Sequence, residues 1–275
     1  MKAVRENGSS YRIVTVLGRA PLQLYSAVVF IFLILPILVV FPLSFTPTSY
    51  LVFPPPGLSL RWYERFFNDY AWMQSIWRSL KIGGLTTVLA IAIGIPLSFA
   101  LVRTRFRGAS LVEQVVSAPI IVPHIVYSVS IFGVFFALGL VGPWYGVALA
   151  HTVLALPFVV IVVMAGLRSF DRNLELAAMG LGASRLQAVL RITLPSVAPS
   201  IVTATFLAFI TSFDELVVAM FLAGADATLP KKMFESIMTA IDPTVAAVSV
   251  VQIVIVSLLL VIVALAGGKL IGPEE

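Results

Sequence analysis

Long runs of uncharged, mostly apolar residues alternate with short polar segments along the chain. Six of these runs hold about 20 residues or more, which is the length that a helix needs to cross about 30 Å of hydrocarbon. The pattern therefore predicts an all-α, polytopic membrane protein with six transmembrane helices. The predicted spans are Leu22–Phe45, Ile82–Val102, Val115–Leu140, Trp144–Leu167, Val197–Ala223 and Val245–Ala266.

The composition excludes a soluble single domain. Hydrophobic residues make up 60% of the 275-residue chain and charged residues 11%, against about 25% charged in an ordinary soluble domain. Lipid must therefore cover the surface that polar side chains cover elsewhere. The chain has no cysteine, which excludes disulfides, thiolate nucleophiles and cysteine-bound metal sites.

Basic and aromatic residues predict the orientation in the membrane. With the N-terminus inside, the inner segments hold twice as many Lys and Arg residues as the outer ones, in agreement with the positive-inside rule. The cluster Arg103–Arg107 is predicted to act mainly in this topological role. All four tryptophans fall on the outer side, at the interface that Trp prefers. We therefore expect a cytoplasmic N-terminal segment (residues 1–21), a six-span domain (22–271) and a cytoplasmic tail (272–275).

The inner segment between spans four and five, residues 168–196, is the longest on that side. Asp171 or Asn173 can cap a short helix, and Gly182 is expected to break it. A second short helix is predicted to end just before Pro195. Two short amphipathic helices joined by a glycine elbow at the inner membrane face would form a rigid knob that another protein can hold.

The same segment carries a recognisable signature. The segment resembles the cytoplasmic signature of the membrane subunits of bacterial binding-protein-dependent ABC importers. In that family the signature is Glu-Ala-Ala, three residues, Gly, nine residues, Ile, one residue, Leu-Pro. Leu176 stands in place of the signature glutamate, and Glu175 lies one position earlier. The matching positions are Ala177, Ala178, Gly182, Ile192, Leu194 and Pro195.

Further motifs resemble the spermidine/putrescine permease branch of that family, and its C-type subunit in particular. These motifs are Leu156-Pro157-Phe158-Val159-Val160, Phe170-Asp171 and Thr211-Ser212-Phe213-Asp214-Glu215-Leu216-Val217-Val218. The resemblance implies a type I ABC importer permease fold and a translocation path for a small cationic solute, most simply a polyamine. The same branch includes permeases for other small amines such as opines and aminoalkylphosphonates, which stay open as alternatives.

The resemblance also implies partners. Residues 168–196 would form coupling helices that insert into ATP-binding subunits, of which two are expected. A second, related permease subunit would complete a heterodimer, and an external binding protein would deliver the solute. The coupling residues carried over are Glu175, Ala177, Ala178, Gly182, Ala183, Ile192, Leu194 and Pro195.

The resemblance places the protein in the bacterial inner (cytoplasmic) membrane, with no role for nucleic acid. No Gly-x-x-x-x-Gly-Lys-Ser/Thr motif occurs in the sequence. ATP and Mg²⁺ are therefore expected on the partner subunits, and this chain is expected to be a non-catalytic transport subunit without a cofactor of its own.

Asp214 and Glu215 are the acidic residues inside a predicted span, about 25 Å from the inner face at 1.5 Å per residue. A lipid-facing charge at this depth is costly, so both should face protein or water. One interpretation is that they line the substrate pathway with Phe209 and Phe213, since an ammonium group leaving water needs a charged or aromatic partner. In that case Asp214 is the more direct pathway residue. The other is that the carboxylates cap a helix or join spans, and that the phenylalanines pack between helices.

The two histidines, His124 and His151, have no second ligand at a metal-binding spacing. We expect no metal site and predict that each forms a hydrogen bond between helices. Two other classes of function remain as alternatives. A secondary transporter would work without an ATPase but leaves the coupling signature unexplained, and an intramembrane enzyme would need a nucleophile with a base or a metal constellation.

Overall fold

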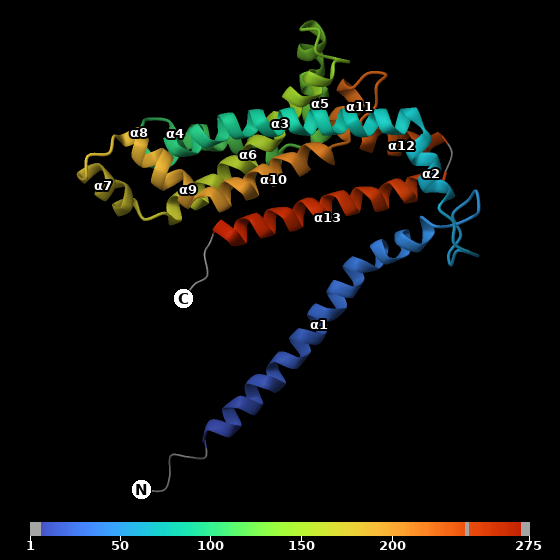
Figure 1. Cartoon of the computed structure of the whole chain (residues 1–275), viewed down its shortest axis with the longest axis horizontal. Coiled ribbons are helices and arrows are strands. Elements are labelled where there is room, and N and C mark those ends of the chain that lie inside the picture. Colours follow the sequence, from blue (N-terminus) through green and yellow to red (C-terminus); the bar gives the residue numbers. More distant parts are fainter. Residues whose placement is uncertain (1–6, 240–241, 271–275) are drawn as a thin grey trace. The chain divides into compact units, whose positions relative to one another are not determined.

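The computed structural model describes the backbone of residues 7–239 and 242–270 and the side chains of residues 21–239 and 242–265. Throughout these residues the regular structure is helical, without a strand (Figure 1). The helices are α1 (Asn7–Leu43), α2 (Arg61–Asn68), α3 (Tyr70–Arg103), α4 (Ala109–Ile121), α5 (His124–Ala137), α6 (Trp144–Ser169), α7 (Arg172–Gly180), α8 (Arg185–Ala188), a π-helical turn (Val189–Thr193), α9 (Leu194–Ser196), α10 (Ala198–Phe213), α11 (Val217–Leu222), α12 (Leu229–Thr239) and α13 (Thr244–Leu270).

The chain divides into two compact units. The first holds the chain up to Glu64 and a short segment before Val251, and the second holds the rest. In the first unit the segment after α1 folds back onto α2: the indole of Trp62 donates to the Thr46 carbonyl at 2.8 Å, and the hydroxyls of Ser44 and Tyr63 lie 2.7 Å apart.

In the described residues, four helices are long and apolar enough to cross a membrane, or up to six spans if each of two bent helix pairs counts as one. The predicted third span is one of these pairs: α4 and α5 meet at 109°. Proline lacks an N–H and forces the preceding residue out of the helical region. Val122, which precedes Pro123, is extended (φ −77°, ψ 126°). The predicted third span is therefore interrupted at this point.

The second unit is organised around α3, α6 and α10, which run side by side (Figure 1). α3 has 34 residues, or about 51 Å at 1.5 Å per residue. It begins at Tyr70, twelve residues before the predicted start, because the Asp69 side chain caps it by accepting the backbone N–H groups of Ala71 and Trp72. The loop helices α7 and α8 lie at one end of this bundle, and α11 and α12 lie at the other.

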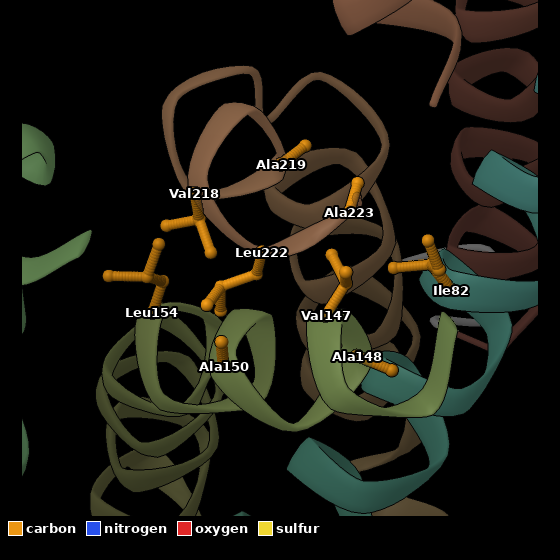
Figure 2. Close-up of a cluster of buried hydrophobic side chains, with 9 residues drawn as sticks. All are labelled: Ile82, Val147, Ala148, Ala150, Leu154, Val218, Ala219, Leu222 and Ala223. Atoms are coloured by element: carbon orange, nitrogen blue, oxygen red, sulfur yellow. The ribbon is translucent and has the colours of Figure 1, made fainter. Parts of the chain in front are cut away.

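Small side chains let the helices of this unit pack closely. Ala90, Ala155, Ala204 and Ala208 are fully buried where α3, α6 and α10 meet. Toward α11, Figure 2 shows Val218 and Leu222 of α11 pointing to α6, with Ile82 of α3 beside α6. These contacts fix the position of the chain segment that joins α10 to α11.

Gly94 of α3 tests this packing. A Cβ at this position would lie 2.5 Å from Cγ1 of Val159 on α6. We therefore expect Gly94→Ala to lower the stability of the detergent-solubilised protein by about 1 to 3 kcal/mol, the usual cost of overpacking. A thermal unfolding assay measures it. Gly84→Ala on the same helix is the matched control, since a Cβ there meets nothing within 4 Å; equal melting temperatures for both variants would contradict the prediction.

Candidate functional site

The predicted fifth span is interrupted next to its acidic residues. α10 ends at Phe213 and α11 begins at Val217, so Asp214 and Glu215 lie in a break within the predicted span, which the sequence pattern did not indicate. The entry to α10 is also bent, by 70° from the helical segment Arg185–Ser196.

The Glu215 carboxylate caps the N-terminus of α11. It accepts the backbone N–H groups of Val217 at 3.1 Å, Val218 at 2.8 Å and Ala219 at 3.4 Å. Glu215 is 5% exposed. These bonds satisfy donors that a helix start leaves free, and an anion at this end is also favoured by the helix dipole. Such satisfaction of broken backbone is what a helix interruption inside a bilayer requires.

Two histidines flank the same carboxylate. The Nδ1 of His124, at the start of α5, lies 3.2 Å from Glu215 Oε1, and the Nε2 of His151, on α6, lies 3.5 Å from Oε2. The Nδ1 of His151 lies 2.8 Å from the Ser212 hydroxyl, which donates to Thr86 at 3.2 Å. The prediction that both histidines form hydrogen bonds between helices is confirmed, and this network joins α3, α5, α6 and α10 at the break.

A cavity of about 370 Å³ opens beside this network. Its walls come from α4, α6 and α10 and are mostly apolar, and Asp214, Glu215 and His124 supply polar groups. Unlike Glu215, Asp214 is exposed. Its Oδ1 accepts a hydrogen bond from the Gln252 side chain of α13 at 3.0 Å. Asp214 is therefore the carboxylate through which a solute in this cavity can be contacted.

The structure does not bring the two predicted phenylalanines to this cavity. Phe213 is 1% exposed and stacks on Phe209 with the ring centroids 5.4 Å apart. Phe209 lies against Gly83 of α3, where an added Cβ would be 3.0 Å from its ring. Both rings therefore pack between α10 and its neighbours, and the cavity is lined mainly by aliphatic groups and by Phe158.

The loop predicted to couple to partners, residues 168–196, has the expected two helices. Asp171 caps α7 by accepting the Asn173 N–H at 2.9 Å. Gly182 has φ +96°, a left-handed conformation that glycine adopts without strain. The second helix continues two residues beyond the predicted end, to Ser196, because a π-helical turn precedes Pro195 and the proline falls in the first turn of α9.

Most of the signature residues of this loop lie at its surface. Ala177, Gly182 and Pro195 are exposed, and Ala178, Ala183, Ile192 and Leu194 are half-buried. Large apolar side chains are also exposed here, among them Leu176 and Leu186, and Leu181 reaches 92%. Exposed apolar side chains gathered on a loop outside the spans are typical of a protein-binding surface.

Glu175 is the exception in this loop, because it points inward. Its Oε2 lies 3.0 Å from Nη2 of Arg103, the last residue of α3, and accepts a hydrogen bond from Thr193 at 3.1 Å. The side chains of Arg103 and Glu175 are 9% and 8% exposed. The prediction that Arg103 serves mainly as a topological determinant is therefore incomplete. A partner so distant in sequence leaves no local pattern by which the pair could have been found.

Among the described residues, no group of three or more His, Cys, Asp or Glu residues has the geometry of a metal site. Several apolar helices, a cavity at a helix break and a loop with exposed apolar side chains are features of the class of transport permeases. Residues 90–274 match the family described as the binding-protein-dependent transport system inner membrane component. The chain belongs to this family, which confirms the resemblance carried by the loop signature and a multi-pass location in the inner membrane.

Curated relatives agree with this assignment. The chain is 33% identical over 236 residues to the spermidine/putrescine transport system permease protein PotC of Haemophilus influenzae, covering 86% of this chain and 91% of that protein. It is 35% identical over 228 residues to the putrescine transport system permease protein PotI of Escherichia coli, covering 80% and 81%.

The fold has solved counterparts. A bacterial ABC transporter that imports the acidic polysaccharide alginate superposes with a TM-score of 0.67 at 19% identity, covering 93% of this chain and 96% of that one. At this identity the likeness establishes the fold, which is that of an ABC importer permease.

Proposed function

We propose that this chain forms, with a second and related permease subunit, the translocation path for a small organic cation of the putrescine and spermidine class. The observation that carries the proposal is the exposed carboxylate of Asp214 in an otherwise mostly apolar cavity at the break between α10 and α11. An ammonium group that leaves water is stabilised by such a carboxylate, and the methylene chain of a polyamine suits apolar walls. The substrates named for PotC and PotI support the same choice.

The chain's own role in this proposal is binding and gating. Two ATP-binding subunits dock on residues 168–196 and hold ATP and Mg²⁺, so that this chain has no cofactor and no catalytic residue. An external binding protein delivers the solute, and both chain termini lie in the cytoplasm with the docking loop. Nucleotide-driven closure of the ATPases then favours one of two states of the permease pair.

Uptake by the native complex tests the proposal. The complex is purified from native membranes, reconstituted in vesicles, and supplied with ATP and labelled putrescine. We expect ATP-dependent uptake that excess spermidine competes away and that collapsing the ion gradients leaves intact. Uptake that needs an ion gradient and no ATP would identify a secondary transporter. ATP-dependent uptake of an opine or an aminoalkylphosphonate with no competition by polyamines would identify a different amine as substrate.

Docking of the ATPases is tested at Leu181. This side chain is 92% exposed, so Leu181→Asp should leave the fold of the chain intact. Burying a leucine contributes about 1.5 to 3 kcal/mol, so the ATP-binding subunits should be held about ten- to a hundredfold more weakly. Co-purification of the ATPases with the tagged permease measures this. Leu58→Asp, at an 80% exposed leucine outside the loop, is the control; equal recovery of ATPase with both variants would place docking elsewhere.

A further inference from the structure

α3 carries a buried arginine near each of its ends. Arg78 lies two turns after the start of the helix, and Arg103 is its last residue. At 1.5 Å per residue the two positions are about 37 Å apart, somewhat more than the thickness of the hydrocarbon core. Buried arginines are retained where their charge is paired, so each should hold α3 to a specific neighbour.

The inner arginine holds α3 to the docking loop. Arg103 pairs with Glu175 on α7 at 3.0 Å, and Glu175 also accepts the hydroxyl of Thr193 in the second helical segment of the loop. A single carboxylate therefore connects both helices of the loop to the end of α3. The guanidinium also lies over the ring of Phe170, 5.6 Å from its centroid, at the start of the loop.

The outer arginine holds α3 to the two connections at the opposite end of the bundle. Nη2 of Arg78 donates to the carbonyl of Gly142 at 2.6 Å, between α5 and α6, and to that of Ala223 at 3.0 Å, just after α11. Its Nη1 lies 2.6 Å from the carboxylate of Asp226. The two connections are themselves joined by a hydrogen bond from the Gly142 N–H to the Leu222 carbonyl at 2.8 Å.

From these contacts we infer that α3 transmits displacement of the docking loop to the α5–α6 connection and to the segment that follows α11, with Arg103–Glu175 and Arg78–Asp226 as its two attachments. The inference rests on the proposed docking of ATPases at residues 168–196. A helix is stiff along its axis, and separating a buried ion pair leaves an uncompensated charge. Movement of α7 therefore displaces α3 before it breaks the pair. The outer attachment then moves α11, whose first turn is capped by Glu215 beside the cavity.

The test uses the complete, reconstituted complex. Arg103→Gln is compared with the charge exchange that combines Arg103→Glu and Glu175→Arg. The matched control is Glu113→Gln on α4, outside the docking loop, which removes an exposed ion pair with 3.7 Å between Arg168 and Glu113 and side chains 61% and 48% exposed. Three quantities are measured: recovery of the ATPases, the rate of ATP hydrolysis stimulated by the loaded binding protein, and solute taken up per ATP.

We expect Arg103→Gln to retain the ATPases and to hydrolyse ATP, while solute taken up per ATP falls about tenfold, a typical size for coupling between two sites. The charge exchange should restore a substantial part of that ratio, and Glu113→Gln should leave it unchanged. Arg78→Gln should cause a similar loss, and the double variant Arg78→Gln/Arg103→Gln should be no worse than either single one, because both act on one path.

Several outcomes would overturn the inference. An assembled Arg103→Gln complex with an unchanged ratio of solute to ATP would do so, as would losses at Arg78 and Arg103 that multiply. If neither Arg103→Gln nor the charge exchange assembles, the pair has a role in assembly and not in transmission. Failure of the proposed docking itself looks different, because the wild-type chain would then be recovered without an ATPase.

Discussion

Replacing Asp214 with asparagine is expected to lower ATP-driven uptake of a polyamine by about ten- to a hundredfold. The exposed carboxylate in the cavity would hold a cationic ammonium through a charge-assisted hydrogen bond, which contributes about 1.5 to 3 kcal/mol. Asparagine keeps the size and the bond to Gln252 within reach, so the break in the span and the assembly of the complex should be unaffected. Uptake of labelled putrescine into vesicles at matched amounts of assembled complex measures the effect.

Two companion variants sharpen this result. Asp214→Glu keeps the charge and should recover a large part of the uptake. Glu113→Gln removes an exposed carboxylate on α4 that does not line the cavity and should leave uptake unchanged. Uptake that is unchanged in Asp214→Asn, together with unchanged solute-stimulated ATP hydrolysis, would exclude Asp214 from the pathway.

Local patterns were sufficient for much of the architecture. Among the described residues, windows of apolar residues located the candidate membrane-spanning helices α1, α3, α6 and α13, the bent pair α4 and α5, and α10, because a bilayer imposes its thickness on each span independently of the others. The two helices of the loop at residues 168–196 were also predicted from the sequence, since a cap at Asp171 and an elbow at Gly182 are set by neighbours in sequence. The loop signature then led to the family, which the comparisons confirm.

The features that sequence patterns missed depend on contacts between distant segments. Hydropathy sums over a window and cannot register that Val122 is extended before Pro123, or that α10 ends at Phe213 and Glu215 caps the helix that follows. Both interrupted segments therefore read as single spans. Arg103 is paired with Glu175 of another helix, α7. In the sequence, Arg103 is one of several neighbouring basic residues, and nothing nearby indicates this partner.

Replacing Glu215 should lower the stability of the folded protein more than replacing Asp214 does. Glu215→Gln is expected to destabilise the protein by about 1.5 to 3 kcal/mol, since an amide has one acceptor oxygen fewer and loses the charge-assisted hydrogen bonds from the start of α11. The amide keeps one acceptor oxygen for the start of α11 but gives up the charge that the flanking His124 and His151 contact. Glu215→Leu, which removes every acceptor, should be worse. The apparent melting temperature in detergent and the yield of assembled complex measure the order of the three proteins.

Uptake by the same variants distinguishes a carboxylate that stabilises the fold from one that contacts the solute. Where Glu215→Gln can be assembled, its uptake per complex should exceed that of Asp214→Asn, because the exposed carboxylate in the cavity is still present. The reverse pattern, a Glu215→Gln complex as stable as wild type but unable to transport, would make Glu215 the carboxylate of the path. Asp214 would then be left as a polar contact to α13. Glu215 is 5% exposed, accepts three backbone N–H groups and lies within 3.5 Å of two imidazoles, which favours the first pattern.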